Sequence, residues 1–516
     1  MTGANDWRAL LTAYCLRHTA YGILFTAHCL PHTAYRIPLT AHCLRHTTVS
    51  CKLSPAHYCL PHNTAIVLTV SDLSRQRNAA RSPRAAYIHI PFCRRRCYYC
   101  DFAISVVGDT KRGESSGTMQ RYVETLIEEI SATPSAKTAP LQTVFFGGGT
   151  PSLLAPSQLD AILSAVSERF GIAQTAEISM EMDPGTFERS HLQAYKAAGI
   201  NRVSLGAQDF HDEVLAASGR FHRKSDILSA VKLLREADLT NFSLDLISGL
   251  PHQTLETWAQ SLQSAIALQP THISQYDLIV EPQTAFSRYF TPGQSPLPSD
   301  EHTAQMYRMA KETLCANGYD HYEICNYAKP GYEAQHNLTY WKCQPCYGFG
   351  MGATSYVNYQ RIDRPRTQRS YRAWVEQFVQ QKGRTEDPAI APEERVLEQI
   401  MVGLRLREGI TLSEIFEVYG DRGLAALGEA IAPHIQNNWV ITERSHDTAS
   451  CIADSCIAAP QTTTSQTTAS QTTATSNIKK LEPTDRIRLS DPEGFVMSNQ
   501  VIVDAFNALE ALRSDE

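Results

Sequence analysis

Between residues 86 and 317, short apolar runs alternate with longer amphipathic stretches, and this alternation limits the folds open to the chain. The apolar runs have the length of buried strands, and the longer stretches have the apolar spacing of helices. Six strand–helix pairs in succession predict a parallel sheet covered by helices. We expect an α/β fold in the form of a partial TIM-like barrel of six such units. A flat, doubly wound sheet is the competing arrangement.

The predicted elements follow one another without a long gap. The strands are expected at Tyr87–Ile90, Val144–Phe146, Ile178–Met182, Arg202–Leu205, Phe242–Ile247 and His272–Ile279. The helices are expected at Met119–Ile130, Pro156–Phe170, Arg189–Ala198, Ser225–Ala237, Leu255–Leu268 and Asp300–Asn317.

The alternation stops near residue 388, which divides a core over residues 83–387 from a smaller domain over residues 388–516. Helical periodicity dominates three ranges there: Glu393–Arg407, Leu412–Tyr419 and Leu424–Ile435. A hairpin is predicted over Arg486–Ile502, with its turn at Asp491–Gly494 and a last helix from Val503. Helices followed by a hairpin indicate a mostly helical, winged-helix-like domain.

Two segments have biased composition. Residues 1–82 repeat a unit resembling Ala-His-Cys-Leu-Arg/Pro-His-Thr about Cys15, Cys29 and Cys43. Cysteine and histidine can ligate metals, but we interpret this segment as a disordered low-complexity leader, or as upstream DNA translated from a misplaced start codon. A Thr/Ser/Gln/Ala tract at about residues 445–480 is too polar to bury itself, and we predict a disordered insertion there.

Three cysteines follow the first predicted strand. Cys93, Cys97 and Cys100 have the spacing C-x3-C-x2-C. A four-iron cubane held by only three thiolates keeps one iron open for another ligand. The amino and carboxylate groups of S-adenosylmethionine (SAM) can chelate such an iron, and electron transfer to the sulfonium would then give a 5′-deoxyadenosyl radical. The alternative is a structural zinc site completed by His89 or a distant ligand.

Polar and glycine residues recur where the later strands end. They are the Gly147–Pro151 loop, Glu181 with Asp183, Gln208, and Asp245. The carboxyl ends of parallel barrel strands share one rim, so we expect one joint site. Carboxylates suit ribose hydroxyls, and Arg220 is the expected partner of the SAM carboxylate.

The charge balance disfavours some partners. A net charge of −6 gives no electrostatic reason to expect nucleic acid, which weighs against a redox sensor with a nucleic-acid-binding module. No apolar run has the length of a membrane-spanning helix, and we place the protein in the cytoplasm. We expect Arg94, Arg95 and Arg96 to be solvated. Alternatively, they stabilise a reduced cluster or form a positive patch for an acidic electron donor.

Several segments resemble one known family. The runs Tyr87–Cys93, Gly147–Pro151, Glu181–Pro184, Arg202–Gln208 and Leu244–Pro251 resemble the oxygen-independent coproporphyrinogen III oxidase group of radical SAM proteins. The resemblance extends from about Ala86 to the C-terminus. It implies a 4Fe-4S cluster on the three cysteines. It also implies SAM contacts at Tyr87, Tyr99, Gly148, Gly149, Thr150, Glu181, Gln208, Arg220 and Asp245.

One departure separates two functions within this group. The oxidases carry a further cysteine two positions after the third, where this chain has Phe102. That pattern and the His336–Trp341 segment (HNxxYW) resemble the heme chaperone subgroup, HemW. The resemblance implies a protein that binds heme and passes it to an acceptor, without decarboxylating coproporphyrinogen III. The oxidase is the alternative function. Two other departures are Tyr98 in place of proline and Thr354 in place of histidine.

The heme ligand and the partners follow from the same resemblance. His336 is the expected axial ligand, with Tyr340 and Trp341 beside the porphyrin. A hydrogen-bonded core histidine is the alternative, and Cys343 and Cys346 are a less favoured thiolate source. The implied partners are a heme-accepting protein and a reductant such as flavodoxin or ferredoxin. Peripheral membrane association and a homodimer stay open.

Overall fold

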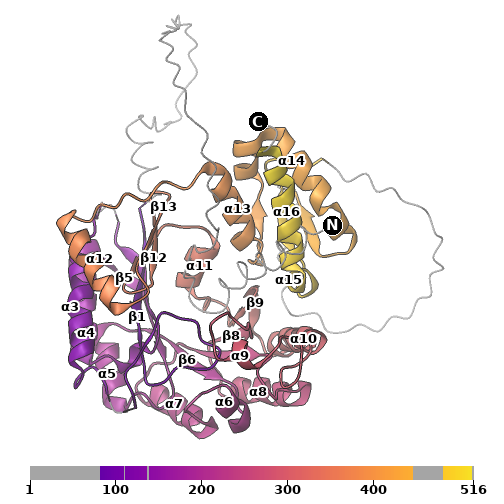
Figure 1. Ribbon diagram of the computed structural model, residues 1–516. Coiled ribbons are helices and arrows are strands. Elements are labelled where there is room, and N and C mark those ends of the chain that lie inside the picture. The colour runs from indigo at the N-terminus through magenta and orange to yellow at the C-terminus, as the bar shows by residue number, and fades with distance from the viewer. Residues whose placement is uncertain (1–81, 110, 136–138, 445–479, 514–516) are drawn as a thin grey trace, which may run out of the picture. The chain divides into compact units, whose positions relative to one another are not determined.

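The computed structural model describes residues 82–109, 111–135, 139–444 and 480–513 (Figure 1). The predicted leader over residues 1–82 and the insertion over residues 445–480 therefore lie outside the described residues, apart from one residue at an edge of each. Among the described residues, no helix combines the length and the apolar character needed to cross a bilayer.

Six parallel strands form the centre of the main sheet. They are β1 (Ala85–Ile90), β4 (Leu141–Gly148), β5 (Ile172–Met182), β6 (Arg202–Gln208), β7 (Phe242–Ser248) and β8 (His272–Asp277). Each pairs in parallel with the next one along the chain. A doubly wound sheet reverses its strand order at a switch point, and this sheet does not. The prediction of a partial barrel is confirmed.

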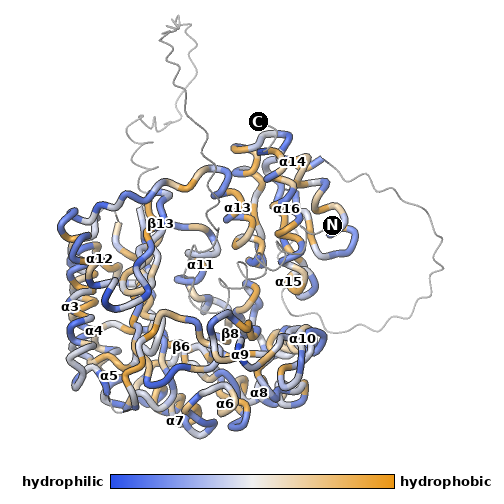
Figure 2. The backbone as a smooth tube through the Cα atoms, in the orientation of Figure 1, coloured by the Kyte–Doolittle hydropathy of each residue, from blue (hydrophilic) through white to orange (hydrophobic). Residues whose placement is uncertain are grey.

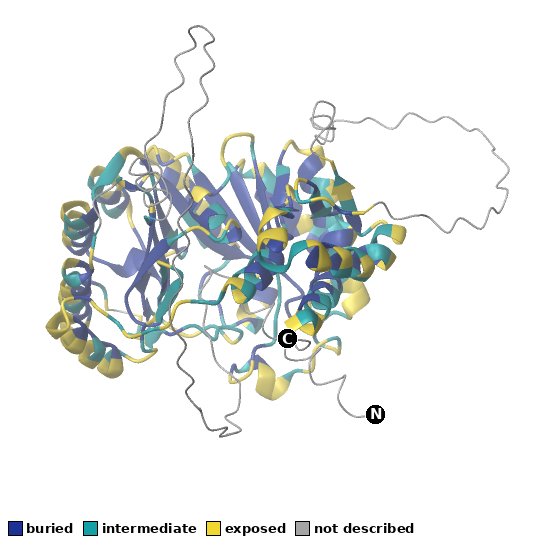
Figure 3. Cartoon of the chain, turned by 90° about the horizontal axis from the view of Figure 1, so that it is seen from above, coloured by how far each residue is buried: buried dark blue, intermediate teal, exposed yellow. Residues whose placement is uncertain are grey.

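Helices cover the outer face of this sheet (Figure 1). They are α3 (Gly117–Ala132), α4 (Pro156–Phe170), α5 (Arg189–Ala198), α7 (Lys224–Glu236), α8 (Leu255–Ala267) and α10 (Asp300–Ala316), with the short α6 (Asp212–Ala217) and α9 (Phe286–Tyr289) between them. The colour in Figure 2 changes within single helices, as expected for amphipathic elements. Strands are buried, and helices expose only their outer faces (Figure 3). On β4, Val144 and Phe146 are fully buried in the core, while alternate residues face the barrel interior.

The barrel interior is polar and forms a hydrogen-bonded chain. Ser243 Oγ donates to Asp245 Oδ1 (3.2 Å) and lies 2.8 Å from Nδ1 of His272. Nε2 of His272 lies 2.8 Å from the Tyr322 hydroxyl, which accepts a bond from the Ala334 amide (3.2 Å). The chain thus runs from the strand that carries Asp245 to the residue that precedes helix α11 (Gln335–Trp341).

Five further strands extend the sheet at both edges and were not predicted. On one side, β11 (Cys346–Phe349) pairs in parallel with β1 and leads into β12 (Thr354–Val357) and β13 (Gln360–Asp363). On the other side, β10 (Asn326–Ala328) and β9 (Asp320–Glu323) continue from β8.

A buried ion pair anchors the region after β11. Arg364 Nε donates to Glu129 on α3 (2.7 Å), and Glu129 also accepts from the Gly350 amide (2.9 Å) and from Tyr371 on α12 (Gln368–Gln380) (2.6 Å). Both charged side chains are buried, so each depends on the other for its compensation.

The C-terminal region combines helices with a small sheet. Its elements are α13 (Pro392–Gly403), β14 (Ile410–Thr411), α14 (Ser413–Gln436), β15 (Val440–Glu443), β16 (Arg486–Leu489), α15 (Glu493–Val496) and α16 (Ser498–Arg513). The three strands are antiparallel, in the order β14-β16-β15. The order α13-β14-α14-β15-β16, with helices interleaved with three antiparallel strands, agrees with a winged-helix-like arrangement.

Two local predictions in this region were wrong, and a third was confirmed. Residues 486–502 do not form a hairpin, because β16 pairs with β14 and β15, and the predicted turn leads into α15, which buries Phe495. The last helix begins at Ser498 rather than Val503. The two helices predicted over residues 412–435 are confirmed, because non-helical backbone at Gly420, with φ 61° and ψ −156°, divides α14 into two helices.

A second hydrophobic core forms mainly from this region. It includes Leu404, Leu427, Ile487 and Ile502, but also Trp341 from α11. Because residues from before position 388 enter this core, the boundary at 388 stays a prediction.

Candidate functional site

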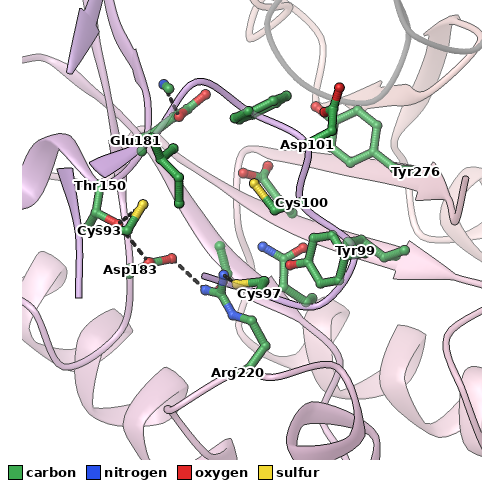
Figure 4. A pocket seen from close by; sticks show the side chains of 18 of the residues that line it. Cys93, Cys97, Tyr99, Cys100, Asp101, Thr150, Glu181, Asp183, Arg220 and Tyr276 are labelled. Carbon is green, nitrogen blue, oxygen red and sulfur yellow. Dashed lines mark hydrogen bonds and ion pairs between the residues drawn. The ribbon is translucent and has the colours of Figure 1, made fainter. Parts of the chain in front are cut away.

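A cleft opens at the carboxyl ends of the barrel strands, with an empty volume of about 1070 Å³ that includes space open to solvent. Most of the predicted site residues line it together (Figure 4). They are Cys93, Cys97, Tyr99, Cys100, Gly148, Gly149, Thr150, Glu181, Gln208, Arg220 and Asp245. Tyr87 and His336 do not line it.

The three cysteines lie on the segment that follows β1. Cys93 ends the two-residue strand β2 (Phe92–Cys93), which pairs with β3 (Ser105–Val106). All three are free thiols of intermediate exposure. Burial raises the pKa of Cys100 to about 12 and that of Cys93 well above its usual value. A metal ligated here must therefore displace protons from these thiols.

The arginines between the cysteines are engaged by the protein. Arg96 donates to the carbonyl groups of Cys100 (3.1 Å), Phe102 (3.2 Å) and Ile104 (3.4 Å). Arg95 pairs with Asp109 (2.6 Å), and Arg94 donates to the carbonyl of Gly185 (3.0 Å). Arg95 and Arg96 are exposed, as expected for solvated side chains, but Arg96 also holds the backbone of the cysteine loop.

Two cysteines are linked through polar side chains (Figure 4). Thr150 Oγ1 donates to Cys93 Sγ (3.7 Å) and to Asp183 (3.0 Å). Asp183 pairs with Arg220, which donates to Cys97 Sγ (3.4 Å). Arg220 is thus already paired with a carboxylate at the place where a SAM carboxylate was expected. Asp183 was noted at the end of its strand but given no SAM contact.

The glycine loop packs against the cysteine segment. The amides of Gly149 and Thr150 donate to the carbonyls of Ile90 (2.8 Å) and Phe92 (2.7 Å). A Cβ at Gly148 would lie 2.4 Å from the His89 ring, and one at Gly149 would lie 2.7 Å from the Phe92 carbonyl oxygen. The glycines are therefore required by contacts within the protein, whatever they also contribute to a ligand.

Glu181 combines burial with a raised pKa. Its carboxyl accepts a hydrogen bond from the Gly148 amide (2.9 Å) and borders the cleft. Burial, opposed by this bond, raises the pKa of Glu181 to about 8. The group is therefore largely protonated at neutral pH. Asp245, whose pKa burial also raises, accepts from Ser204 (2.9 and 2.8 Å).

Tyr87 and His336 lie below the cleft, within the barrel. The Tyr87 hydroxyl lies 3.1 Å from His89 Nδ1, and its ring stacks against Phe145. His336 is 1% exposed, with Nδ1 2.8 Å from Thr143 and Nε2 2.7 Å from Tyr340. Burial lowers the pKa of His336 to about 3. This neutral, doubly hydrogen-bonded ring matches the core-histidine alternative, so a role as heme ligand stays a prediction.

A single metal ion has no preformed site in this part of the chain. Among the described residues, no three Cys, His, Asp or Glu side chains are placed to hold one. Tyr276, Asp277 and Glu281 also line the cleft. They were not predicted, because they lie at and beyond the end of β8, where no sequence motif marks a site.

Comparisons with known proteins agree with this architecture. Residues 87–265 match the model of the Radical SAM superfamily. A Synechocystis protein named "Heme chaperone HemW" is 43% identical over 83% of this chain and 97% of that protein. A Bacillus subtilis protein of the same name is 34% identical over 72% of this chain and 94% of its own length.

The fold also matches a solved structure. The structure described as coproporphyrinogen III oxidase (HemN) from Escherichia coli, a radical SAM enzyme, covers 85% of this chain and 93% of its own, with a TM-score of 0.62 and 20% identity. At this identity the likeness is one of fold alone.

The raised pKa of Glu181 predicts a specific pH dependence of stability. In the unfolded chain this glutamate is exposed and has its usual pKa, whereas in the folded protein its pKa is about 8. Between these two pH values the folded protein binds one proton more than the unfolded chain. Stability therefore falls as the pH rises through this range. In Glu181→Gln, the fall in the free energy of unfolding between pH 5 and pH 8 should be smaller by ~1–2 kcal/mol, since the carboxyl borders an open cleft. Denaturation of the ligand-free protein across this range measures it.

The matched control is Glu168→Gln, on the exposed face of α4, which should keep the pH dependence of the unsubstituted protein. Parallel stability curves for the unsubstituted protein and Glu181→Gln would contradict the assignment.

Proposed function

The chain belongs to the HemW family of radical SAM proteins, and from this we propose that it binds heme and passes it to an acceptor protein. A 4Fe-4S cluster and SAM are the other cofactors of this function. The observation that supports the cofactor part is the gathering of three free cysteine thiols and the polar strand ends around one cleft. The heme part rests on the family relationship and on the His336–Trp341 segment.

The donor set fits an iron–sulfur cluster. Three thiols share one loop, and a cubane distributes its cysteine ligands over different irons, so they need not converge on one point. We assign Cys93, Cys97 and Cys100 as ligands. When bound, the cluster supplies an electron and an open iron position for SAM. Thr150 and Arg220, which donate to two of the sulfurs, would stabilise their negative charge.

The SAM contacts are assigned to the same rim. Glu181 and Asp245 offer carboxyl groups to the nucleoside, Gln208 an amide, and Tyr99 an aromatic ring. Arg220 can meet the SAM carboxylate by sharing its guanidinium between that group and Asp183. Tyr87 supports the site from below, by packing against Phe145 beneath the glycine loop.

The alternative function, oxidative decarboxylation of coproporphyrinogen III, is less well supported. Phe102 lines the cleft at the position where the oxidases were expected to carry a further cysteine. A phenyl ring supplies no thiol ligand or redox group there. The remaining rim residues are compatible with both functions, so Phe102 carries the distinction.

Location and partners follow from the same proposal. We place the protein in the cytoplasm, where an acceptor of heme and a reductant such as a flavodoxin or ferredoxin would meet it. Arg95 pairs with Asp109, and Arg94 donates to a carbonyl group. A positive patch for the reductant would therefore depend more on Arg94 than on Arg95 or Arg96.

The proposal is tested on the anaerobically reconstituted full chain. Heme titration should give saturable binding, and the bound heme should pass to an apo-globin, followed by the absorbance of the product. Incubation with coproporphyrinogen III, SAM and a strong reductant should give no protoporphyrinogen. Formation of that product would support the oxidase instead, and failure to bind heme would remove the chaperone function.

Two substitutions in α11 test His336 as the heme ligand. If Nε2 ligates iron, the Tyr340 bond must open first. Tyr340→Phe should then bind heme several-fold more tightly, because a hydrogen bond contributes about 1 kcal/mol, whereas His336→Ala should lose affinity and change the heme absorbance. Unchanged spectra and affinities in both variants would leave His336 as a core residue.

The cysteine loop offers a second test with a matched pair. Arg96→Met removes three hydrogen bonds to loop carbonyls, so we expect several-fold faster loss of iron to a chelator. Arg95→Met removes only an exposed ion pair, which contributes little, and should release iron as the unsubstituted protein does. Equal rates in both variants would show that the loop does not depend on Arg96.

A further inference from the structure

A second cavity lies beside the cleft and has no assigned role. Its empty volume is about 1560 Å³, including space open to solvent. Residues 276–279, at and just beyond the end of β8, line both the cleft and this cavity. On its other sides it is bounded by α10, by Ile324 after β9, and by the start of α16.

Polar and apolar groups contribute similar shares of the cavity lining, and we call its apolar residues the apolar wall. Its apolar side chains include Leu278, Ile279, Tyr307, Ile324, Phe495 and Val496. An apolar wall with a few placed polar groups is the usual composition of a small-molecule site.

Among the described residues, one buried cation lines this cavity without a salt bridge, although its charge also acts on the buried carboxyl of Glu323, whose pKa burial raises to about 8. Arg405 is 1% exposed, and its Nη2 donates to Asn499 (3.2 Å), but its Nε and Nη1 have no hydrogen-bond partner. Within the described residues Arg405 forms no ion pair. A buried cation left with two free N–H groups is costly unless an anion compensates it.

The backbone around Arg405 holds this side chain in place. Its carbonyl accepts from the Ile324 amide (2.9 Å), and its own amide donates to Val402 (3.1 Å). The N-terminal end of α16, at Ser498, borders the same cavity, and the first amides of a helix favour a negative ligand. The two acids that line the cavity lie elsewhere: Asp277 is bonded to Ser248 and Gln275, and Asp300 is on α10.

We propose that this cavity binds heme, with a propionate carboxylate held by Arg405 Nε and Nη1 and the porphyrin against the apolar wall. A guanidinium offers two parallel N–H groups to a carboxylate, and heme combines such carboxylates with a large apolar face. The proposal rests on the proposed heme function, and because His336 does not line this cavity, heme bound here would take its iron ligand from another residue. It places the heme next to the cleft, across the wall formed by residues 276–279.

The test compares two ligands and three proteins by absorbance titration of the full chain. Heme and its dimethyl ester, which lacks free carboxylates, are titrated into the unsubstituted protein, Arg405→Met and Arg407→Met. Arg407 is exposed, two residues away, and does not line the cavity. We expect Arg405→Met to bind heme about tenfold or more weakly and to bind both ligands alike. The unsubstituted protein and Arg407→Met should prefer heme over the ester by a similar factor.

The outcomes separate the two proposals. Failure of the unsubstituted protein to bind heme refutes the chaperone function itself. Heme binding with equal affinity for heme and ester in the unsubstituted protein, or unchanged heme affinity in a folded Arg405→Met, overturns the Arg405 site alone. Should Arg405→Met unfold in thermal melts, the preference of the unsubstituted protein for heme over its ester decides the matter.

Discussion

The parallel register between β1 and β4 is the constraint on which the cleft depends. It places His89 opposite Gly147 and Ile90 opposite Gly148, so the segments that follow these strands lie close together. This close approach is possible only because Gly148 and Gly149 have no side chains. Amide bonds then join the glycine loop to the cysteine segment. The cysteine loop is thus positioned by strand pairing rather than by its own cysteines.

The second organising feature is a barrel interior filled with polar groups. The outward-facing residues of each strand form an apolar core with the helices, while the inner residues include Ser, Asp and His side chains that bond one another, beside the stacked rings of Tyr87 and Phe145. Such groups are tolerated in a protein interior when they are paired. Burial raises the pKa values of the acids near the cleft, and the hydrogen bonds to these acids oppose that rise.

The sequence predicted most of the barrel, and the reasons for its failures are physical. A short apolar run marks Val144–Phe146 and a helical pattern marks Pro156–Phe170. Both can be recognised because the burial of each element is visible in its own local sequence. Strand β11 pairs with β1 across more than two hundred residues, and no local pattern reports such a partner. The cysteine spacing and strand-end positions predicted which residues meet in the cleft. They could not show that Arg220 pairs with Asp183 or that both nitrogens of His336 are bonded, since these contacts depend on tertiary packing.

The chain from Asp245 to Ala334 has one further consequence, which concerns the direction of its hydrogens. When Ser243 donates its hydrogen to Asp245, it accepts from Nδ1 of His272. The neutral ring, whose pKa burial lowers, then carries its proton on Nδ1 and accepts at Nε2 from the hydroxyl of Tyr322. Every link therefore points toward the carboxylate, and no single link can reverse alone. The hydrogen bonds of this chain all have the same direction. The backbone amide of Ala334 is the donor at one end, and Asp245, an acid that lines the cleft, is the acceptor at the other.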